Sequence, residues 1–167
     1  TAYLVERSVR PEEILLLTFT RKASQEMLKR ASLILDERCE RVSGGTFHSF
    51  SNMVLRRYAN VLGISRDFTI LDRPDAEDTV NLIRTKLGFS KTKSRFPRKD
   101  ALLDIISKSV NKSEPLEKII NGEYLQFSEW LNEIIKIGRE YVEYKHSKSI
   151  LDYDDLLVYL KRLLSGH

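Results

Sequence analysis

The run ILLLTF at residues 14–19 restricts the fold most, because it is continuously apolar instead of alternating. Runs of this kind are typical of strands covered on both faces, as in a parallel sheet with helices above and below it. Directly after the run, apolar residues recur at helical spacing, at Ala23, Met27, Ala31 and Ile34. Thr20 is a predicted N-cap, because its hydroxyl can accept a hydrogen bond from an amide of the first turn. This segment therefore predicts a strand followed by a helix.

The same pattern recurs 28 residues later along the chain. The short strand-like run VSGGTF at residues 42–47 again ends in a Thr-Phe pair. His48 and Ser49 then open a second predicted helix, whose apolar face would carry Phe50, Val54 or Met53, and Tyr58. Two strand-to-helix units in succession predict an α/β sheet.

The remainder of the chain is dominated by helical patterns. Asp72 is a predicted N-cap, and Pro74 is acceptable in the first turn that follows it. Helical patterns follow at residues 80–87, 102–110, 116–120 and 127–146, and no strand is predicted among them. Residues from 73 onwards are therefore expected to form a separate all-helical unit, and another helix is expected to start at residues 150–157.

Composition indicates a folded, water-soluble protein, since 41% of residues are hydrophobic and 31% are charged. The net charge of +4 and the pI of about 9.1 permit an acidic partner such as nucleic acid without requiring one. No apolar run approaches the roughly 20 residues that cross a bilayer. Cys39 has no second cysteine to pair with, and the three histidines are too scattered to form a metal site with it. We therefore expect a cytoplasmic protein without membrane or metal.

The two Thr-Phe pairs carry the residues most suited to binding a ligand. Ligands of open α/β sheets collect at the carboxyl ends of the strands, where the following helices present free amides. That edge would hold hydroxyls, cations and aromatic rings, the groups that bind phosphates and stack on bases of single-stranded nucleic acid. The candidates are Phe19, Thr20, Arg21, Lys22, Thr46, Phe47, His48 and Ser49. The alternative is that the phenylalanines are core residues and the cations a solvated helix face.

Three motifs resemble those of the UvrD/Rep/PcrA-type superfamily 1 DNA helicases. ILLLTFTRKASQEM at residues 14–27 is similar to their motif Ia, and GTFHSF at residues 45–50 is similar to their motif Ib. LDYDDLL at residues 151–157 resembles their motif Id. The motifs occur in the family's order and span nearly the whole chain, so the resemblance is more specific than any one motif.

The resemblance implies an α/β fold that is predominantly helical overall. Residues 1–72 and 150–167 would be part of a RecA-like (P-loop NTPase) motor domain with a parallel sheet, and residues 73–149 an inserted all-α subdomain. Phe19 and Tyr153 would contact bases of the bound strand, and Thr20, Thr46, His48 and Ser49 would lie along its backbone. The family uses ATP and Mg²⁺ to move along single-stranded DNA, 3′ to 5′, and to unwind duplex junctions.

The chain departs from the family pattern in several places. Arg21 stands where asparagine is usual, Ser24 replaces alanine, and Tyr153 replaces phenylalanine. No GxxxxGK[ST] phosphate loop precedes the first strand, and no Walker B Asp-Glu pair follows the last helix. We therefore expect a part of a longer protein that alone holds no cofactor and hydrolyses no ATP. Its incomplete sheet would have open edges through which two copies could pair.

Other readings of the same residues remain open at this point. The parent could be the helicase subunit of a helicase-nuclease, or a non-catalytic single-stranded-DNA-binding or interaction module. The basic stretch around Phe96 could contact duplex phosphates or be a solvated loop; its cations are Lys91, Lys93, Arg95, Arg98 and Lys99. Asp152, Asp154 and Asp155 are interpreted as a helix cap and first-turn acids, so no residue is assigned to catalysis or to a metal.

Overall fold

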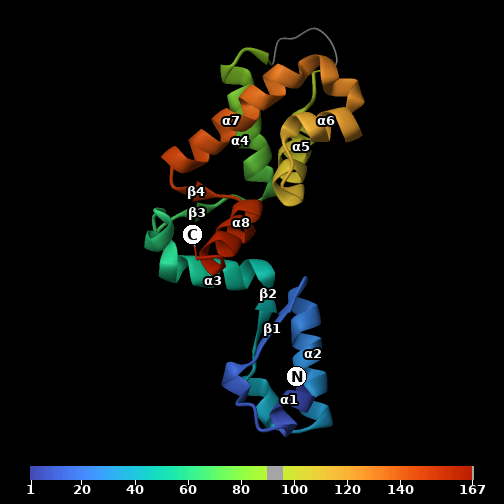
Figure 1. Cartoon of the computed structure of the whole chain (residues 1–167), viewed down its shortest axis with the longest axis vertical. Coiled ribbons are helices and arrows are strands. Elements are labelled where there is room, and N and C mark those ends of the chain that lie inside the picture. The colour runs from blue at the N-terminus through green and yellow to red at the C-terminus, as the bar shows by residue number, and fades with distance from the viewer. Residues whose placement is uncertain (90–95, 167) are drawn as a thin grey trace. The chain divides into compact units, whose positions relative to one another are not determined.

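The computed structural model describes residues 1–89 and 96–166 and consists of two compact units, Thr1–Arg57 and Tyr58–His167. Helices make up most of the chain, as Figure 1 shows, and each unit carries one two-stranded parallel sheet. The prediction of a predominantly helical chain with parallel strand pairing is therefore confirmed. The strands form two separate pairs within the described residues, so a complete RecA-like sheet is not seen.

The first unit is a strand-helix-strand arrangement followed by another helix. Its elements are α1 (Ala2–Glu6), the 3-10 turn η1 (Pro11–Glu13), β1 (Leu15–Thr18), α2 (Arg21–Ile34), the 3-10 turn η2 (Glu37–Arg41), β2 (Ser43–Thr46) and α3 (Phe47–Tyr58). β1 and β2 are parallel and in register from Leu15 opposite Ser43 to Thr18 opposite Thr46. Both predicted strand-to-helix units are thus present.

Helix α2 packs on the sheet through small side chains. Ser24 and Ala31 are buried, whereas Met27 and Ile34 of the predicted apolar stripe are 48% and 77% exposed. The helix can come this close because β2 carries glycine: a Cβ at Gly44 would lie 2.8 Å from Ser24 Oγ. The predicted burial is therefore correct for Ala31 and wrong for Met27 and Ile34.

The first unit has a small core, and β1 is not covered on both faces as predicted. Leu15 is 44% exposed. The buried residues come from α1, α2, η2 and the residues just before the two strands: Val5, Ile14, Ala31, Cys39 and Val42. With so little apolar area buried, hydrophobic stabilisation of this unit is correspondingly small.

In the second unit, most of the helices lie along the chain between two short strands, and these strands pair with each other. Its elements are the 3-10 turn η3 (Ala59–Leu62), β3 (Thr69–Ile70), α4 (Arg73–Lys86), α5 (Lys99–Lys112), α6 (Leu116–Glu123), the 3-10 turn η5 (Leu125–Trp130), α7 (Leu131–Ser147), β4 (Ile150–Leu151) and α8 (Tyr153–Leu164). β3 pairs in parallel with β4, with Thr69 opposite Ile150. The chain thus leaves this sheet after residue 70 and returns to it at residue 150, and residues 73–89 and 96–149 contain no strand.

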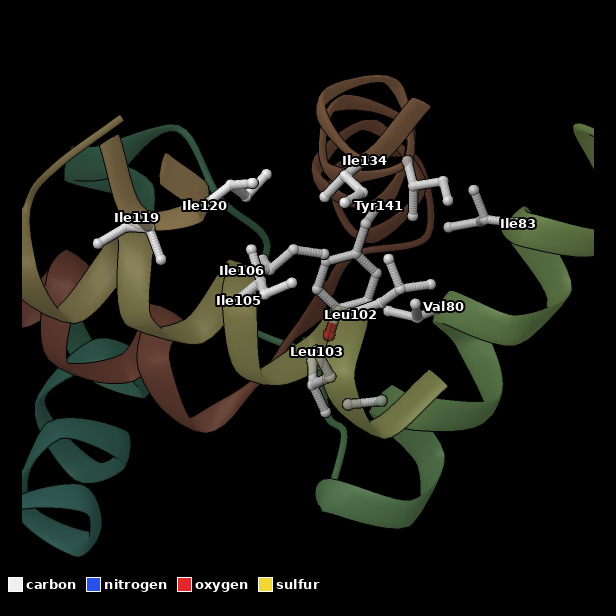
Figure 2. Packing of buried hydrophobic residues seen from close by; sticks show 12 residues of the cluster. Val80, Ile83, Leu102, Leu103, Ile105, Ile106, Ile119, Ile120, Ile134 and Tyr141 are labelled. Atoms are coloured by element: carbon white, nitrogen blue, oxygen red, sulfur yellow. The ribbon is translucent and has the colours of Figure 1, made fainter. Parts of the chain in front are cut away.

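The core of the second unit lies among α4, α5, α6 and α7. Figure 2 shows Val80 of α4, Leu102 of α5 and Ile134 of α7 pointing toward one another around the ring of Tyr141. Helices α6 and α7 approach closely at Gly138, where a Cβ would lie 2.9 Å from a methyl carbon of Leu116. This core is larger than that of the first unit. Helix α8 packs against α5, one of the helices that form it.

Among residues 1–89 and 96–166, no helix is both long and apolar enough to cross a membrane. Within the same ranges, no three side chains of the metal-binding types gather closely enough to hold an ion.

Candidate nucleic-acid interface

The first unit brings the two Thr-Phe pairs together at the carboxyl edge of its sheet. Thr18 lies opposite Thr46 in the register, so the chain leaves both strands at the same level, at Phe19 and Phe47. The two rings are in contact, with centroids 5.8 Å apart and planes tilted by 44°. Phe19 is 92% exposed and Phe47 is 39% exposed. Within this unit the pair is a surface feature, so the alternative that both rings are core residues is wrong.

Hydroxyl groups on either side of Phe19 hold its backbone. The Thr18 hydroxyl donates to the Thr20 carbonyl oxygen at 2.8 Å. The Thr20 hydroxyl accepts from the Ala23 amide at 3.1 Å, which confirms Thr20 as the N-cap of α2. The ring of Phe19 therefore projects from a backbone that is tied down on both sides.

Thr46 and Ser49 tie the second corner in the same way. The Thr46 amide donates to the Ser49 hydroxyl at 3.0 Å, and the Ser49 amide donates to the Thr46 hydroxyl at 3.1 Å. The Ser49 hydroxyl also donates to the Thr46 carbonyl oxygen at 2.9 Å. Because the hydroxyls are engaged with each other and with the backbone, their first role is to shape the corner that carries Phe47.

Two cations lie beside the aromatic pair, in the first turn of α2. Arg21 and Lys22 are exposed, and within the described residues neither forms an ion pair. A helix N-terminus also carries a partial positive charge from its unpaired amides. The edge therefore combines an exposed aromatic ring with uncompensated positive charge, which suits a phosphate backbone with attached bases. His48, the remaining candidate, is half-buried at the start of α3.

Replacing Thr20 with alanine is expected to lower the free energy of unfolding of the first unit by about 1 kcal/mol, because the amide of Ala23 loses its acceptor. Thr20→Ser keeps the hydroxyl and should remain close to the parent. Urea unfolding followed by far-UV circular dichroism measures both variants. Equal stability of Thr20→Ala and Thr20→Ser would show that the cap contributes nothing.

Tyr153 belongs to the second unit, where it is the first residue of α8. Its side chain is 47% exposed. It borders a cavity of about 180 Å³ together with Leu71, Arg73 and Leu103. Its contact with bases of a bound strand stays a prediction.

The predicted basic stretch is only partly described. Lys91, Lys93 and Arg95 lie outside the described residues. Arg98 is exposed at the N-cap position of α5, and Lys99 donates to Asp78 of α4 at 2.5 Å. The charge of Lys99 is therefore compensated within the protein, which makes it less suited to a DNA contact than Arg98.

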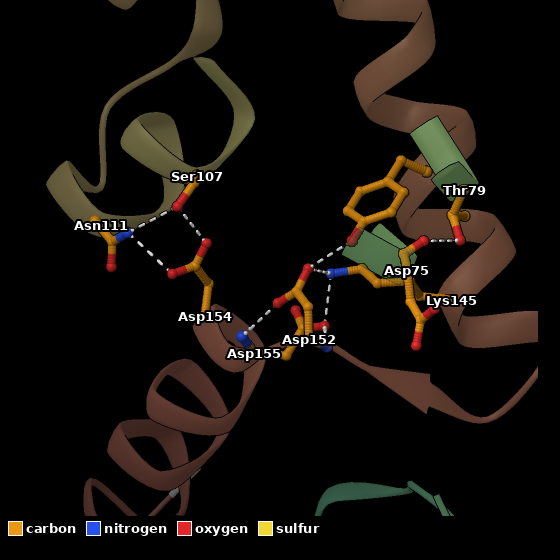
Figure 3. A network of polar contacts seen from close by, with 9 residues as sticks. Asp75, Thr79, Ser107, Asn111, Lys145, Asp152, Asp154 and Asp155 are labelled. Carbon is orange, nitrogen blue, oxygen red and sulfur yellow. Dashed lines mark hydrogen bonds and ion pairs between the residues drawn. The ribbon is translucent and has the colours of Figure 1, made fainter. Parts of the chain in front are cut away.

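A charged cluster around Lys145, which includes Asp152 and Asp155 on either side of Tyr153 in the chain, was missed from the sequence. Lys145 of α7 is 7% exposed, and its Nζ lies 2.6 Å from Asp152 and 2.5 Å from Asp155 (Figure 3). The Tyr141 hydroxyl donates to Asp152 at 2.9 Å. A signal was present: Lys145 continues the apolar face of α7 that carries Ile137 and Tyr141.

The predicted cap at the start of α8 is confirmed within this cluster. Asp152 accepts from the Asp155 amide at 2.9 Å, and Asp155 accepts from the Asp152 amide at 3.0 Å. The two carboxylates thus form a reciprocal capping box. Their function as helix-capping groups explains them without any catalytic role.

Burial and charge act against each other in this cluster. Burial favours a neutral Lys145, but the attraction of Asp155 and Asp152 outweighs it and raises the pKa of the ammonium. Burial also opposes ionisation of Asp152, yet the Lys145 ammonium holds the pKa of that carboxyl below its usual value. For Asp155, burial prevails and the pKa is raised. The charge that the fold tolerates least is therefore that of Asp155.

Comparisons with known proteins place the chain in one family. A family model for the UvrD/REP helicase N-terminal domain matches residues 1–167. The ATP-dependent DNA helicase PcrA of Bacillus subtilis is 33% identical over 164 residues, which cover 94% of this chain and 21% of that protein. PcrA of Staphylococcus epidermidis is 27% identical over 158 residues. PcrA of Staphylococcus aureus is 40% identical over 80 residues, 47% of this chain and 11% of that protein.

The chain thus spans about a fifth of the length of the relatives that match it along most of its length. The exposed Phe19–Phe47 pair lies within the two motifs at residues 14–27 and 45–50. On the match over its whole length, the chain belongs to the family of UvrD/REP helicase N-terminal domains.

Proposed function

We propose that this chain is the strand-binding portion of an ATP-dependent DNA helicase and that its first unit binds single-stranded DNA through the Phe19–Phe47 pair. The observation that carries the proposal is the 92% exposure of Phe19 at a sheet edge, in contact with a second ring. Single exposed apolar residues are common on protein surfaces, but two exposed rings in contact with each other beside cations form a patch, which indicates a binding surface. The exposure of Phe19 beside Arg21 and Lys22 favours a surface on which a base stacks while cations hold the phosphates.

The complete protein would be a motor, and this chain would form a part of its first motor domain. Residues 1–72 and 150–167 would belong to a RecA-like motor domain, and residues 73–149 to a helical subdomain inserted in it. The relatives' description as ATP-dependent DNA helicases supports ATP with Mg²⁺ as the cofactors of that motor. Translocation from 3′ to 5′ along the strand belongs to the same proposal. No residue of this chain is assigned to the nucleotide.

The interface would bind DNA without reading its sequence. Every base has a π-face, so stacking on Phe19 would tolerate any base, and contacts to phosphates carry no sequence information. A motor that moves along a strand requires such tolerance at each position. The proposal therefore predicts similar affinities for oligonucleotides of different composition.

Phe19→Ala is expected to weaken binding of a fluorescein-labelled oligothymidylate by about 1–3 kcal/mol, the usual contribution of one stacked base. Arg21→Ala should instead reduce the dependence of binding on salt, because one phosphate contact is lost. At high salt the Phe19 variant should therefore bind more weakly than the Arg21 variant, since screening weakens phosphate pairing more than stacking. Fluorescence anisotropy across a salt series measures both effects.

Leu33→Ala is the matched control, because Leu33 is a large exposed apolar residue of α2 (77% exposed) outside the strand ends. It should leave the affinity unchanged. If Phe19→Ala binds as tightly as Leu33→Ala, the aromatic pair has no part in DNA binding and the proposed interface is wrong.

A further inference from the structure

We propose that Ser107 and Asn111 of helix α5 are positioning residues for Tyr153. They would hold this ring in place through the neighbouring carboxylate of Asp154. The inference rests on the proposed function and, in addition, on the prediction from the family resemblance that Tyr153 also contacts the bound strand. It adds that helix α5 determines the position of the Tyr153 ring.

Tyr153 lies between two aspartates whose side chains are bound by different helices. Asp152, on one side, is held from α7 by the Tyr141 hydroxyl at 2.9 Å and the Lys145 ammonium at 2.6 Å. Figure 3 shows the carboxylates of Asp152 and Asp154 pointing apart, each toward its own partners. The backbone on both sides of the ring is therefore anchored.

Asp154, on the other side, is held from α5. The Ser107 hydroxyl donates to one carboxylate oxygen at 2.5 Å, and the Asn111 amide donates to the other at 3.0 Å. The Asn111 amide also donates to the Ser107 hydroxyl at 3.1 Å, so the two donors are themselves connected (Figure 3). These contacts join residues 47 and 43 positions apart in the chain. Their formation therefore depends on the packing of α5 against α8.

The α5 anchor also borders the space beside the ring. Ser107, Asp154 and Tyr153 line the same cavity of about 180 Å³. A side chain half-exposed beside a cavity of this size can occupy more than one rotamer unless its surroundings restrict it. Fixing Asp154 restricts the first turn of α8, from which the Tyr153 side chain projects.

The two anchors differ in burial, which makes the second one suitable for an experiment. Lys145 and Asp152 are 7% and 8% exposed, so removing either would break a buried ion pair and destabilise the whole unit. Asn111 is exposed and Ser107 only partly buried. Truncating these two should loosen the start of α8 while leaving the core intact.

The test compares the Ser107→Ala/Asn111→Ala double variant with Lys112→Ala in the full 167-residue chain. Lys112 is on the same helix but pairs with Glu123, not with Asp154. The first measurement is ¹⁹F NMR of protein labelled with fluorotyrosine, in which Tyr153→Phe identifies the resonance of Tyr153. The double variant should shift or broaden that resonance, and Lys112→Ala should leave it unchanged.

The second measurement is oligothymidylate affinity, with and without Tyr153→Ala in the background. The double variant should bind about three- to tenfold more weakly, a part of one stacking contribution. In the Tyr153→Ala background the same double change should have no effect, because a positioning residue acts only through the residue it positions. A loss caused merely by reduced stability would persist in both backgrounds.

Each outcome decides between the two proposals. A Tyr153 resonance that is unchanged in the double variant, or an equal loss of affinity in both backgrounds, would overturn the positioning role. If the resonance responds but Tyr153→Ala itself leaves affinity unchanged, the ring is anchored as described but does not bind DNA. The inference that Ser107 and Asn111 act on DNA binding then fails together with the predicted Tyr153 contact, whereas the proposed function is tested separately through Phe19.

Discussion

Lys145→Met is expected to lower the free energy of unfolding of the second unit by about 3–5 kcal/mol, the usual effect of removing one partner from a buried ion pair. The lysine ammonium is the positive group between the buried carboxylate of Asp152, at 2.6 Å, and the partly buried carboxylate of Asp155, at 2.5 Å. Methionine fills similar space but leaves both carboxylates without a counter-charge. Urea unfolding monitored by the fluorescence of Trp130 measures the change.

Two variants make this expectation specific. Asp155→Asn should cost less than Lys145→Met, because it keeps the Lys145–Asp152 ion pair and removes the carboxylate whose ionisation burial opposes. Lys112→Met, which breaks the exposed pair with Glu123, should have a small effect, since water replaces the lost contact. If Lys145→Met is no more destabilising than Lys112→Met, the cluster does not stabilise the fold.

The same cluster fixes the sign of the pH dependence. The folded state raises the pKa of Lys145, so its contribution is complete below the ordinary lysine value of 10.5 and is lost as the pH rises through the raised value. The folded state lowers the pKa of Asp152, so its contribution is complete above 3.8 and is lost as the pH falls through the lowered value. The folded state raises the pKa of Asp155, so its contribution to stability is complete below 3.8 and is lost as the pH rises through the raised value.

Leu102→Ala is expected to destabilise the second unit by about 2–5 kcal/mol, through lost burial and the cavity left behind. Leu102 is fully buried and faces residues of α4 and α7, so the surrounding helices can close the space only in part. Leu125→Ala is the matched control, since Leu125 is 65% exposed and loses little contact on truncation. Differential scanning calorimetry of the two variants measures the difference.

The outcome also shows whether the two units unfold independently. The buried cluster of the first unit contains none of the residues around Leu102. If the units are independent, Leu102→Ala should move only the thermal transition of the second unit. Equal melting of Leu102→Ala and Leu125→Ala would contradict the assignment of Leu102 to a tightly packed core.

Features that depend on neighbouring residues could be read from the sequence. The caps at Thr20, Asp72 and Asp152 were predicted correctly, because each hydroxyl or carboxylate bonds an amide only three residues away. The strands ending in Thr-Phe and the helices that follow them were predicted for the same reason. Their periodicity is local and repeats within about two helical turns.

Features that depend on distant partners could not be read in this way. β4 contains only Ile150 and Leu151, too few residues for a recognisable period, and it exists through pairing with β3 about 80 residues earlier. The exposure of Met27 was not foreseeable either. It follows from the close packing of α2 on Gly44, which the helix sequence alone does not reveal.

The candidate site likewise combines features set by neighbouring residues with features set by distant partners. The sequence by itself determined which residues stand at the strand ends, because strand, cap and helix follow one another within ten residues. Only the tertiary structure decided that Phe19 and Phe47 touch, since their contact requires parallel pairing of β1 with β2. It also decided that Lys145 is buried as an ion, because the two carboxylates that compensate it come from another helix.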